Sequence, residues 1–168
     1  DEGEILLRGE PIDIDSPSAA IDSRVGMIHQ HFMLVPTLTV CENVALGTAS
    51  NRRPFTDLEN VATRISDISN EHGLAVDPSV KVEHLSVGER QRVEIIKALY
   101  RDAELLVLDE PTAVLTPKEV EDLFVILRRM ADGGKGLIFI SHKLREVMSL
   151  SDRITVLRDG EVVGETTP

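Results

Sequence analysis

The sequence is poor in aromatic residues, in cysteine and in long apolar runs. It has no tryptophan and a single cysteine, Cys41, so an intrachain disulfide is impossible and nothing points to an oxidising compartment. No apolar run approaches the roughly 20 residues that a membrane-spanning helix needs. With 168 residues and 42% hydrophobic residues, the chain is long enough for one domain with an apolar core.

Positive charge is also scarce. Lys and Arg number 18 against 29 Asp and Glu, which gives a net charge of −11. This balance argues against binding to a nucleic-acid duplex, because such surfaces are normally basic. It does not exclude a nucleotide site, because glycine turns and helix N-termini can bind phosphate inside an acidic protein. We therefore expect no nucleic-acid partner.

Residues 85–116 hold the densest group of signals. The apolar run Leu105–Leu108 ends in two acids, Asp109 and Glu110. Such a run is typical of a central parallel strand that is buried on both faces. Ligands of open α/β sheets bind outside the carboxyl ends of the strands. One acid beside Mg²⁺ and one beside an attacking water would suit phosphoryl transfer, although the dipeptide alone fits an acidic surface turn equally well.

Two further apolar runs end in polar residues. Gln30 follows Val25–Ile28, and His142 follows Leu137–Ile140. Each alone would be read as a surface-loop residue, but polar residues after three predicted strands point to one edge of one sheet. Helical and apolar segments alternate after residue 90, which predicts a parallel sheet that also includes the run at 154–157. Asp159-Gly160 lies between apolar pairs and predicts a hairpin.

Serine or threonine followed by glutamate marks several helix starts. We expect helices to begin at Thr39, Thr56, Ser86 and Thr116. These signals predict a mostly helical subdomain at residues 37–100. That subdomain would be inserted between two parts of an α/β core, 1–36 and 101–168.

Gly88 is unusual because it lies in the first turn of its predicted helix. Glycine there costs about 1 kcal/mol relative to alanine, which suggests that something approaches the backbone closely. Ser86 by itself reads as an N-cap. Together with the free N–H groups of the helix start, Ser86 and Gly88 would make a good anion site.

These motifs together resemble a known family. LSVGERQ at 85–91 resembles the signature loop of ATP-binding-cassette (ABC) ATPases, and LLVLDEP at 105–111 resembles their Walker B strand. Ser141-His142 is similar to the switch histidine of the family, and Gln30 to the glutamine of the Q-loop. HQHFMLVPTLTVCENVALG and DEPTAVLTPKE resemble the ATPase subunits of importers for simple sugars and nucleosides. The resemblance implies an α/β fold of the P-loop NTPase type with an inserted helical subdomain.

The resemblance also implies roles for these residues. Glu110 would polarise the attacking water, Asp109 would hold Mg²⁺, and His142 would contact the γ-phosphate of ATP. Gln30 would reach both the metal and the water. The residues that would bind ATP held by a second cassette, in a head-to-tail pair, are Ser86, Val87, Gly88 and Glu89. The partners would be transmembrane permease subunits, at the cytoplasmic face of the membrane.

Two features depart from the family pattern. The phosphate-binding loop GxxxxGK[ST] does not occur among the 168 residues, so we expect a cassette without its N-terminal portion that alone hydrolyses ATP negligibly. Thr116 stands where many members have Asp, which questions the cross-dimer role of that position. The alternatives are a soluble ABC-type ATPase acting on DNA or ribosomes, and a non-catalytic fragment of the fold.

Overall fold

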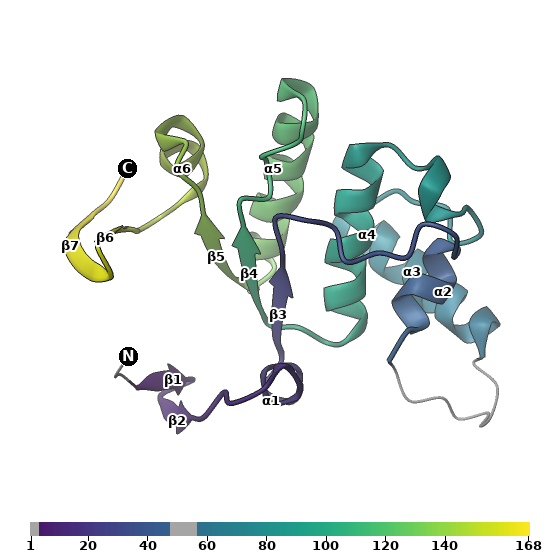
Figure 1. Cartoon of the computed structure of the whole chain (residues 1–168), viewed down its shortest axis with the longest axis horizontal. Helices are drawn as coiled ribbons and strands as arrows, with labels where there is room; N and C mark the ends of the chain where they lie inside the picture. Colours follow the sequence, from purple (N-terminus) through teal and green to yellow (C-terminus); the bar gives the residue numbers. More distant parts are fainter. Residues whose placement is uncertain (1–3, 48–56) are drawn as a thin grey trace.

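A three-stranded parallel sheet forms the centre of the protein. The computed structural model describes residues 4–47 and 57–168. The sheet has the order β3 (Val25–Ile28), β4 (Leu105–Asp109), β5 (Gly136–Ile140). All three carboxyl ends point the same way, upward in Figure 1. The three apolar runs therefore form the predicted parallel sheet.

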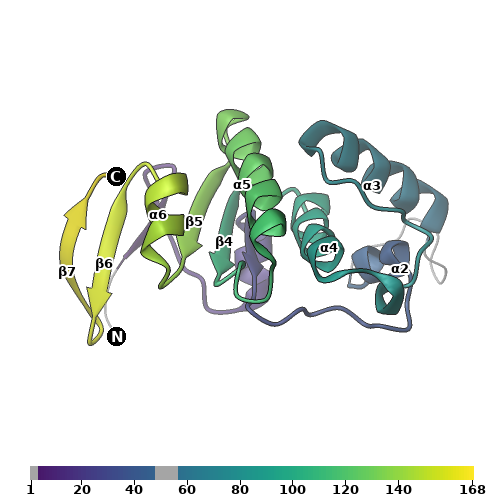
Figure 2. The ribbon, with the colours of Figure 1, turned by 90° about the horizontal axis from the view of Figure 1, so that it is seen from above.

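Two long helices cover one face of this sheet (Figure 2). They are α4 (Val87–Tyr100) and α5 (Pro117–Asp132). Phe124 of α5 meets Phe139 of β5 edge to face, with ring centroids 5.8 Å apart. Leu106 and Leu108 of β4 are fully buried in the core.

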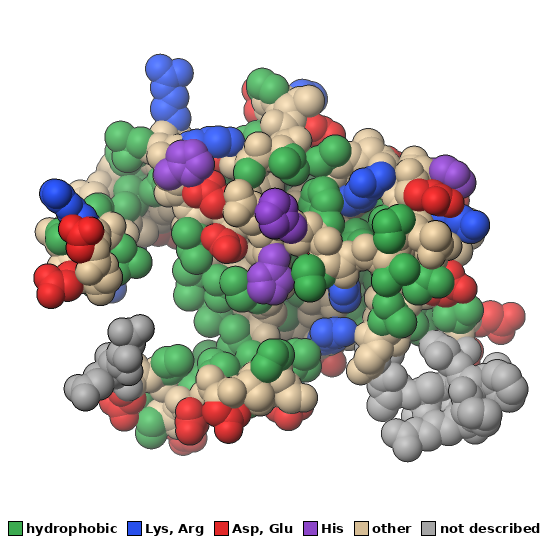
Figure 3. Space-filling model, in the orientation of Figure 1, with side chains coloured by type: hydrophobic (Ala, Val, Ile, Leu, Met, Phe, Trp, Pro, Cys, Tyr) green, Lys and Arg blue, Asp and Glu red, His purple; other side chains and the backbone are tan. Residues whose placement is uncertain are grey.

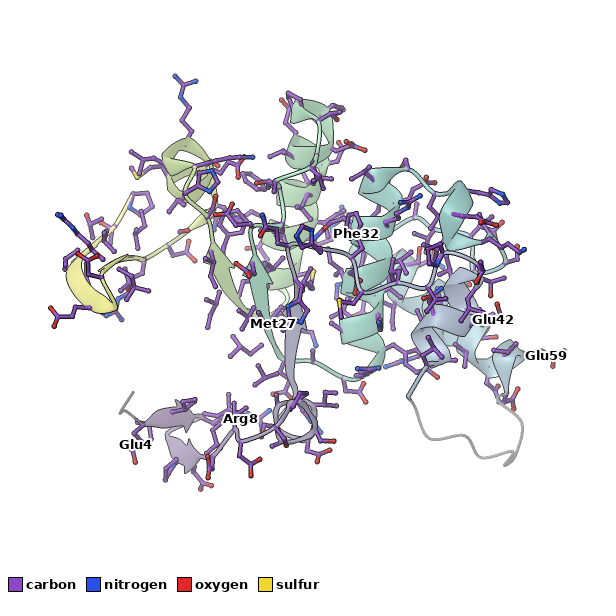
Figure 4. The ribbon with its side chains drawn as sticks, in the orientation of Figure 1. Glu4, Arg8, Met27, Phe32, Glu42 and Glu59 are labelled. Carbon is purple, nitrogen blue, oxygen red and sulfur yellow. The ribbon has the colours of Figure 1, made fainter. Side chains whose placement is uncertain are left out.

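The opposite face of the sheet is more exposed than the sequence predicted. Met27, Ile138 and Ile140 are about half exposed, and burial along β4 alternates. The expectation that this strand is buried on both faces is therefore wrong for the part of the chain that the structure describes. Figure 4 labels Met27 on β3, and apolar side chains are visible over the strands in Figure 3.

Within the described residues, three helices and one short 3₁₀ turn lie between β3 and β4 in the chain. They are α2 (Val40–Ala45), α3 (Leu58–His72), the turn η1 (Val82–His84) and α4. Thr39 begins α2 with the predicted capping box, and Ser86 begins α4 with another. The expected start at Thr56 lies outside the described residues, and Asp57 is the N-cap of α3.

The remaining strands form two antiparallel hairpins. β1 (Ile5–Leu7) pairs with β2 (Glu10–Ile12), and β6 (Ile154–Arg158) pairs with β7 (Glu161–Thr166). Asp159 and Gly160 both have positive φ, 52° and 83°, as a two-residue hairpin turn requires. This turn returns the chain directly alongside β6, so β6 finds its partner locally. The prediction that residues 154–157 extend the parallel sheet is therefore wrong.

Two short helices connect these parts. Helix α1 (Pro17–Asp22) precedes β3, and its N-cap Ser16 accepts a hydrogen bond from the Ala19 N–H. Helix α6 (Leu144–Leu150) lies between β5 and β6. In the described ranges, no helix combines the length and apolar character that crossing a bilayer requires.

Candidate functional site

Glu110 directly follows β4 in a strained backbone conformation. Asp109, the last residue of the strand, pairs with Ile140 of β5. The Glu110 N–H then donates to the Ile140 carbonyl at 3.0 Å, and its φ is +47°. A positive φ at a non-glycine residue costs about 1–3 kcal/mol and persists where the surroundings impose it. Such strain is typical of functional sites.

The side chain of Glu110 contacts His142. Glu110 Oε1 lies 2.6 Å from His142 Nδ1 and accepts the His142 backbone N–H at 3.1 Å. The Glu110 side chain is 17% exposed and the His142 side chain 77%. The other carboxylate oxygen, Oε2, is buried and has no hydrogen-bond partner among the residues that the structure describes. A buried carboxylate oxygen without a partner is available to accept a proton or a hydrogen bond from a bound molecule.

The other two predicted residues lie at the same edge of the sheet. Asp109 is half-buried at the end of β4, and Gln30 is exposed just beyond the end of β3. Gln30 lines a cavity of about 250 Å³ together with Val114, which belongs to the segment after Glu110. Figure 3 shows histidine and acidic side chains next to one another over the upper ends of the strands. In residues 4–47 and 57–168, no cluster of three or more His, Cys, Asp or Glu could hold a metal ion.

A partly buried polar network lies between the segments that follow Glu110 and His142. The Thr112 hydroxyl, which is fully buried, donates to Glu146 Oε2 at 2.5 Å. Lys143 Nζ donates to the Thr112 carbonyl at 3.1 Å and lies 3.2 Å from Glu146 Oε1. The network therefore joins the segment after Glu110 to the segment after His142. The sequence offers no signal for it, because Thr112 is more than 30 residues from Lys143 and Glu146.

The segment that follows Gln30 is attached to α4. Glu94, a buried residue of α4, accepts the Met33 N–H at 2.5 Å. Lys97, one turn later, donates to the Met33 carbonyl at 3.0 Å. The same helix therefore binds both the backbone N–H and the backbone carbonyl of Met33. Figure 4 labels Phe32 next to this attachment.

At the predicted anion site at the start of α4, a side chain of the protein itself accepts one of the backbone N–H groups. The capping box is present, with Ser86 Oγ accepting from Glu89 N–H and Glu89 Oε2 from Ser86 N–H. Two hydrogen bonds with Ser86 lower the pKa of Glu89. The bond from the Ser86 backbone N–H has the largest effect, and the bond with the Ser86 side chain comes second. The Gly88 N–H, however, donates to Glu119 Oε1 at 3.1 Å. The sequence predicted a close approach to the Gly88 backbone, but it did not predict that Glu119 is the residue that approaches.

The predicted site residues therefore form two groups. Gln30, Asp109, Glu110 and His142 lie at the carboxyl edge of the sheet. Ser86, Val87, Gly88 and Glu89 lie at the start of α4, and no hydrogen bond within the described residues joins them to Glu110 or His142. Thr116 is the N-cap of α5, with a capping box to Glu119.

Comparison with known proteins assigns the family. The model of the ABC transporter family matches residues 1–113, which is more than half of the chain. The chain belongs to the ABC transporter family.

Its curated relatives are import proteins. A glucose import ATP-binding protein of Haloferax volcanii is 47% identical, with 98% of this chain and 35% of the relative covered. A nucleoside import ATP-binding protein of Lactococcus lactis is 46% identical, over 96% of this chain and 32% of the relative. A ribose import ATP-binding protein of Rubrobacter xylanophilus is 44% identical, over 99% of this chain and 34% of the relative. The chain spans about a third of the length of these relatives.

Solved cassettes share the fold. CbiO1 of Clostridium perfringens, part of an ABC transporter complex, superposes with a TM-score of 0.80 at 25% identity, over 99% of this chain and 66% of that one. A dimeric ATP-binding cassette in a post-hydrolysis state, bound to ADP and Pi, superposes with a TM-score of 0.76 at 28% identity. The superposition covers 99% of this chain and 73% of that one. The α/β cassette fold predicted from the sequence is therefore confirmed.

Proposed function

We propose that these residues belong to the ATP-hydrolysing subunit of an importer that takes up a sugar or a nucleoside. The observation that carries this proposal is the Glu110–His142 pair at the carboxyl end of β4, beside Asp109. The named relatives, which are import ATP-binding proteins for glucose, nucleosides and ribose, support the substrate class.

The residues at the sheet edge divide the chemistry between them. Glu110 polarises the water that attacks the γ-phosphate, and its unpartnered Oε2 can accept that proton. His142 holds the Glu110 carboxylate and contacts the γ-phosphate. Asp109 and the amide oxygen of Gln30 are the hard oxygen donors that suit Mg²⁺. Because few protein ligands are present, water and phosphate oxygens would complete the shell; the ion would neutralise charge on the phosphates.

The residues at the start of α4 serve a second nucleotide. Ser86 and Gly88 bind the γ-phosphate of ATP held by another cassette, in a head-to-tail pair, and Val87 and Glu89 belong to the same nucleotide site. A helix N-terminus favours an anion there through its free N–H groups and its dipole. In this scheme residues 37–100 act as a helical subdomain, and 1–36 with 101–168 belong to the α/β core.

The remaining partners follow from transport. Transmembrane permease subunits bind the cassette at the cytoplasmic face of the membrane. The acidic charge of −11 speaks against a nucleic-acid partner.

The test uses the full-length protein that carries these residues. Wild-type protein should bind and hydrolyse Mg-ATP, whereas Glu110→Gln should keep Mg-ATP binding and lose about 10²–10⁴-fold in kcat. Glu121→Gln is the matched control, because Glu121 is 74% exposed on α5. A wild-type protein that binds no Mg-ATP, or a Glu110→Gln variant with unchanged kcat, would refute the proposal.

A further inference from the structure

The backbone of Gly88 is covered by a side chain from another helix. Glu119 of α5 accepts the Gly88 N–H with Oε1 at 3.1 Å, and Gly88 is buried. A Cβ at Gly88 would lie 2.7 Å from Glu119 Oε1 and 3.1 Å from Cδ. Any larger residue would therefore push the carboxylate away. The glycine is explained by an intramolecular contact with Glu119.

The same carboxylate also caps its own helix. Glu119 Oε2 accepts the Thr116 N–H at 2.9 Å and the Thr116 hydroxyl at 2.7 Å. One side chain thus bridges the N-termini of α4 and α5, where free N–H groups and helix dipoles favour negative charge. The hydrogen bonds from Thr116, then the one from Gly88, lower the pKa of Glu119 and keep it ionised.

A cavity with a mixed lining of apolar, charged and amide side chains lies beside this contact. Its volume is about 270 Å³, and its lining includes Gly88, Gln91, Arg92 and Glu119. Gln91 is only 3% exposed, and within residues 4–47 and 57–168 its Nε2 has no hydrogen-bond partner. A buried amide without an acceptor is costly. The cavity therefore offers both space and an unused donor to a carboxylate that leaves Gly88.

We propose that Glu119 regulates phosphate binding at the start of α4. Its carboxylate holds the Gly88 N–H until the γ-phosphate of ATP on the opposite cassette displaces it into the cavity beside Gln91. This regulation rests on the proposed function, because it needs a phosphate to arrive at Gly88. It also links nucleotide binding to the contact between the starts of α4 and α5, since the displaced hydrogen bond joins them.

The decisive variant is Glu119→Gln in the full-length protein. Glutamine has one acceptor oxygen, so it can serve Thr116 or Gly88 but not both. The matched control is Glu42→Gln, because Glu42 Oε2 alone accepts both groups of Thr39 in the capping box of α2. Glu119→Asp, which keeps the charge but is shorter by one methylene, provides a second variant if glutamine disturbs folding.

Two measurements are made on each protein. Hydrogen exchange of the Gly88 amide without nucleotide reports the contact directly, because an N–H in the first turn has no acceptor within its own helix. We expect exchange to become about tenfold faster in Glu119→Gln, while the Glu89 amide, bonded to Ser86, stays unchanged. Steady-state ATPase should show a KM for Mg-ATP lowered about tenfold with little change in kcat. Glu42→Gln should alter neither quantity.

The possible outcomes bear differently on the regulation by Glu119 and on the proposed function. Unchanged Gly88 exchange in both Glu119 variants would overturn the contact and with it the regulation. Faster exchange together with an unchanged KM would overturn the regulation and leave the proposed function standing. A wild-type protein with no Mg-ATP turnover would overturn both, and Glu119 would then act only as a structural cap.

Discussion

Glu110 Oε1 lies 2.6 Å from Nδ1 of His142 and 3.1 Å from its backbone nitrogen, so a single residue holds this carboxylate at two points. If the two residues act as one unit, their effects on kcat should not add. His142→Ala alone is expected to lower kcat of the full-length protein about 10²-fold or more. The double variant with Glu110→Gln should be no slower than the slower single variant. Multiplicative losses would show that the two act independently.

Gly26 of β3 lies where the core has no room for a side chain. A Cβ there would be 3.0 Å from the Cβ of Ala98 and 3.1 Å from that of Ala103. We expect Gly26→Ala to destabilise the protein by about 1–3 kcal/mol through overpacking. Urea unfolding measures this loss. Gly164→Ala is the control, because, apart from its chain neighbours, no described residue has an atom within 4 Å of the Cβ position; equal stability losses in the two variants would contradict this account.

Asn43 organises the loop that precedes α2. It is fully buried, accepts the Val35 N–H at 2.7 Å and donates to the Val35 and Thr39 carbonyls, each at 3.0 Å. Asn43→Ala should cost about 1–3 kcal/mol, because it removes the acceptor of the Val35 N–H, whereas the Val35 and Thr39 carbonyls keep the backbone N–H groups of Leu38 and Asn43. Asn60→Ala, at an exposed position of α3, should stay within about 0.5 kcal/mol. A small loss at Asn43 would mean that water replaces the amide.

The capping-box glutamates should make stability depend on pH. Hydrogen bonds with Thr39 lower the pKa of Glu42, the backbone N–H contributing more than the side chain. Hydrogen bonds with Ser86 lower the pKa of Glu89 in the same way, and those with Thr116 lower the pKa of Glu119. A carboxyl whose pKa is lowered by folding binds more protons when unfolded. The stability it contributes is therefore present above the ordinary carboxyl pKa of about 4.3 and is lost as pH falls through the lower folded value.

Thermal unfolding across this acid range tests the expectation. Tm should fall between about pH 5 and pH 3. The fall should be smaller in Glu42→Gln, which removes one of the titrating groups and keeps a capping acceptor. An identical pH profile in the wild type and in this variant would assign the acid sensitivity to other carboxylates.

The helix starts show how much local sequence can predict. Thr39, Ser86 and Thr116 all cap helices as expected, because a cap depends on residues within one turn of the chain. The sheet edge was predictable for a related reason. Polar residues after short apolar runs place Gln30, Asp109 and His142 at the ends of parallel strands, once the strands are known to be adjacent.

Contacts between distant segments were not predictable in the same way. The run at 154–157 has the same composition as a parallel strand, but a two-residue turn pairs it with β7. The Thr112–Lys143–Glu146 network and the bond from Gly88 to Glu119 join residues 31 to 34 positions apart. Nothing in the local pattern specifies such partners, because they depend on how helices pack across the sheet.

The sequence by itself determined the helix caps, the three central strands, the family and the positions of the candidate acids and histidine. These features depend on short-range hydrogen bonding and on the burial of apolar runs. Only the tertiary structure decided that Glu110 bonds to His142, that its second oxygen has no partner in the described part of the chain, and that Glu119 covers Gly88. Those relationships arise when α4, α5 and the ends of β4 and β5 come together, and their geometry is set by packing across the whole core.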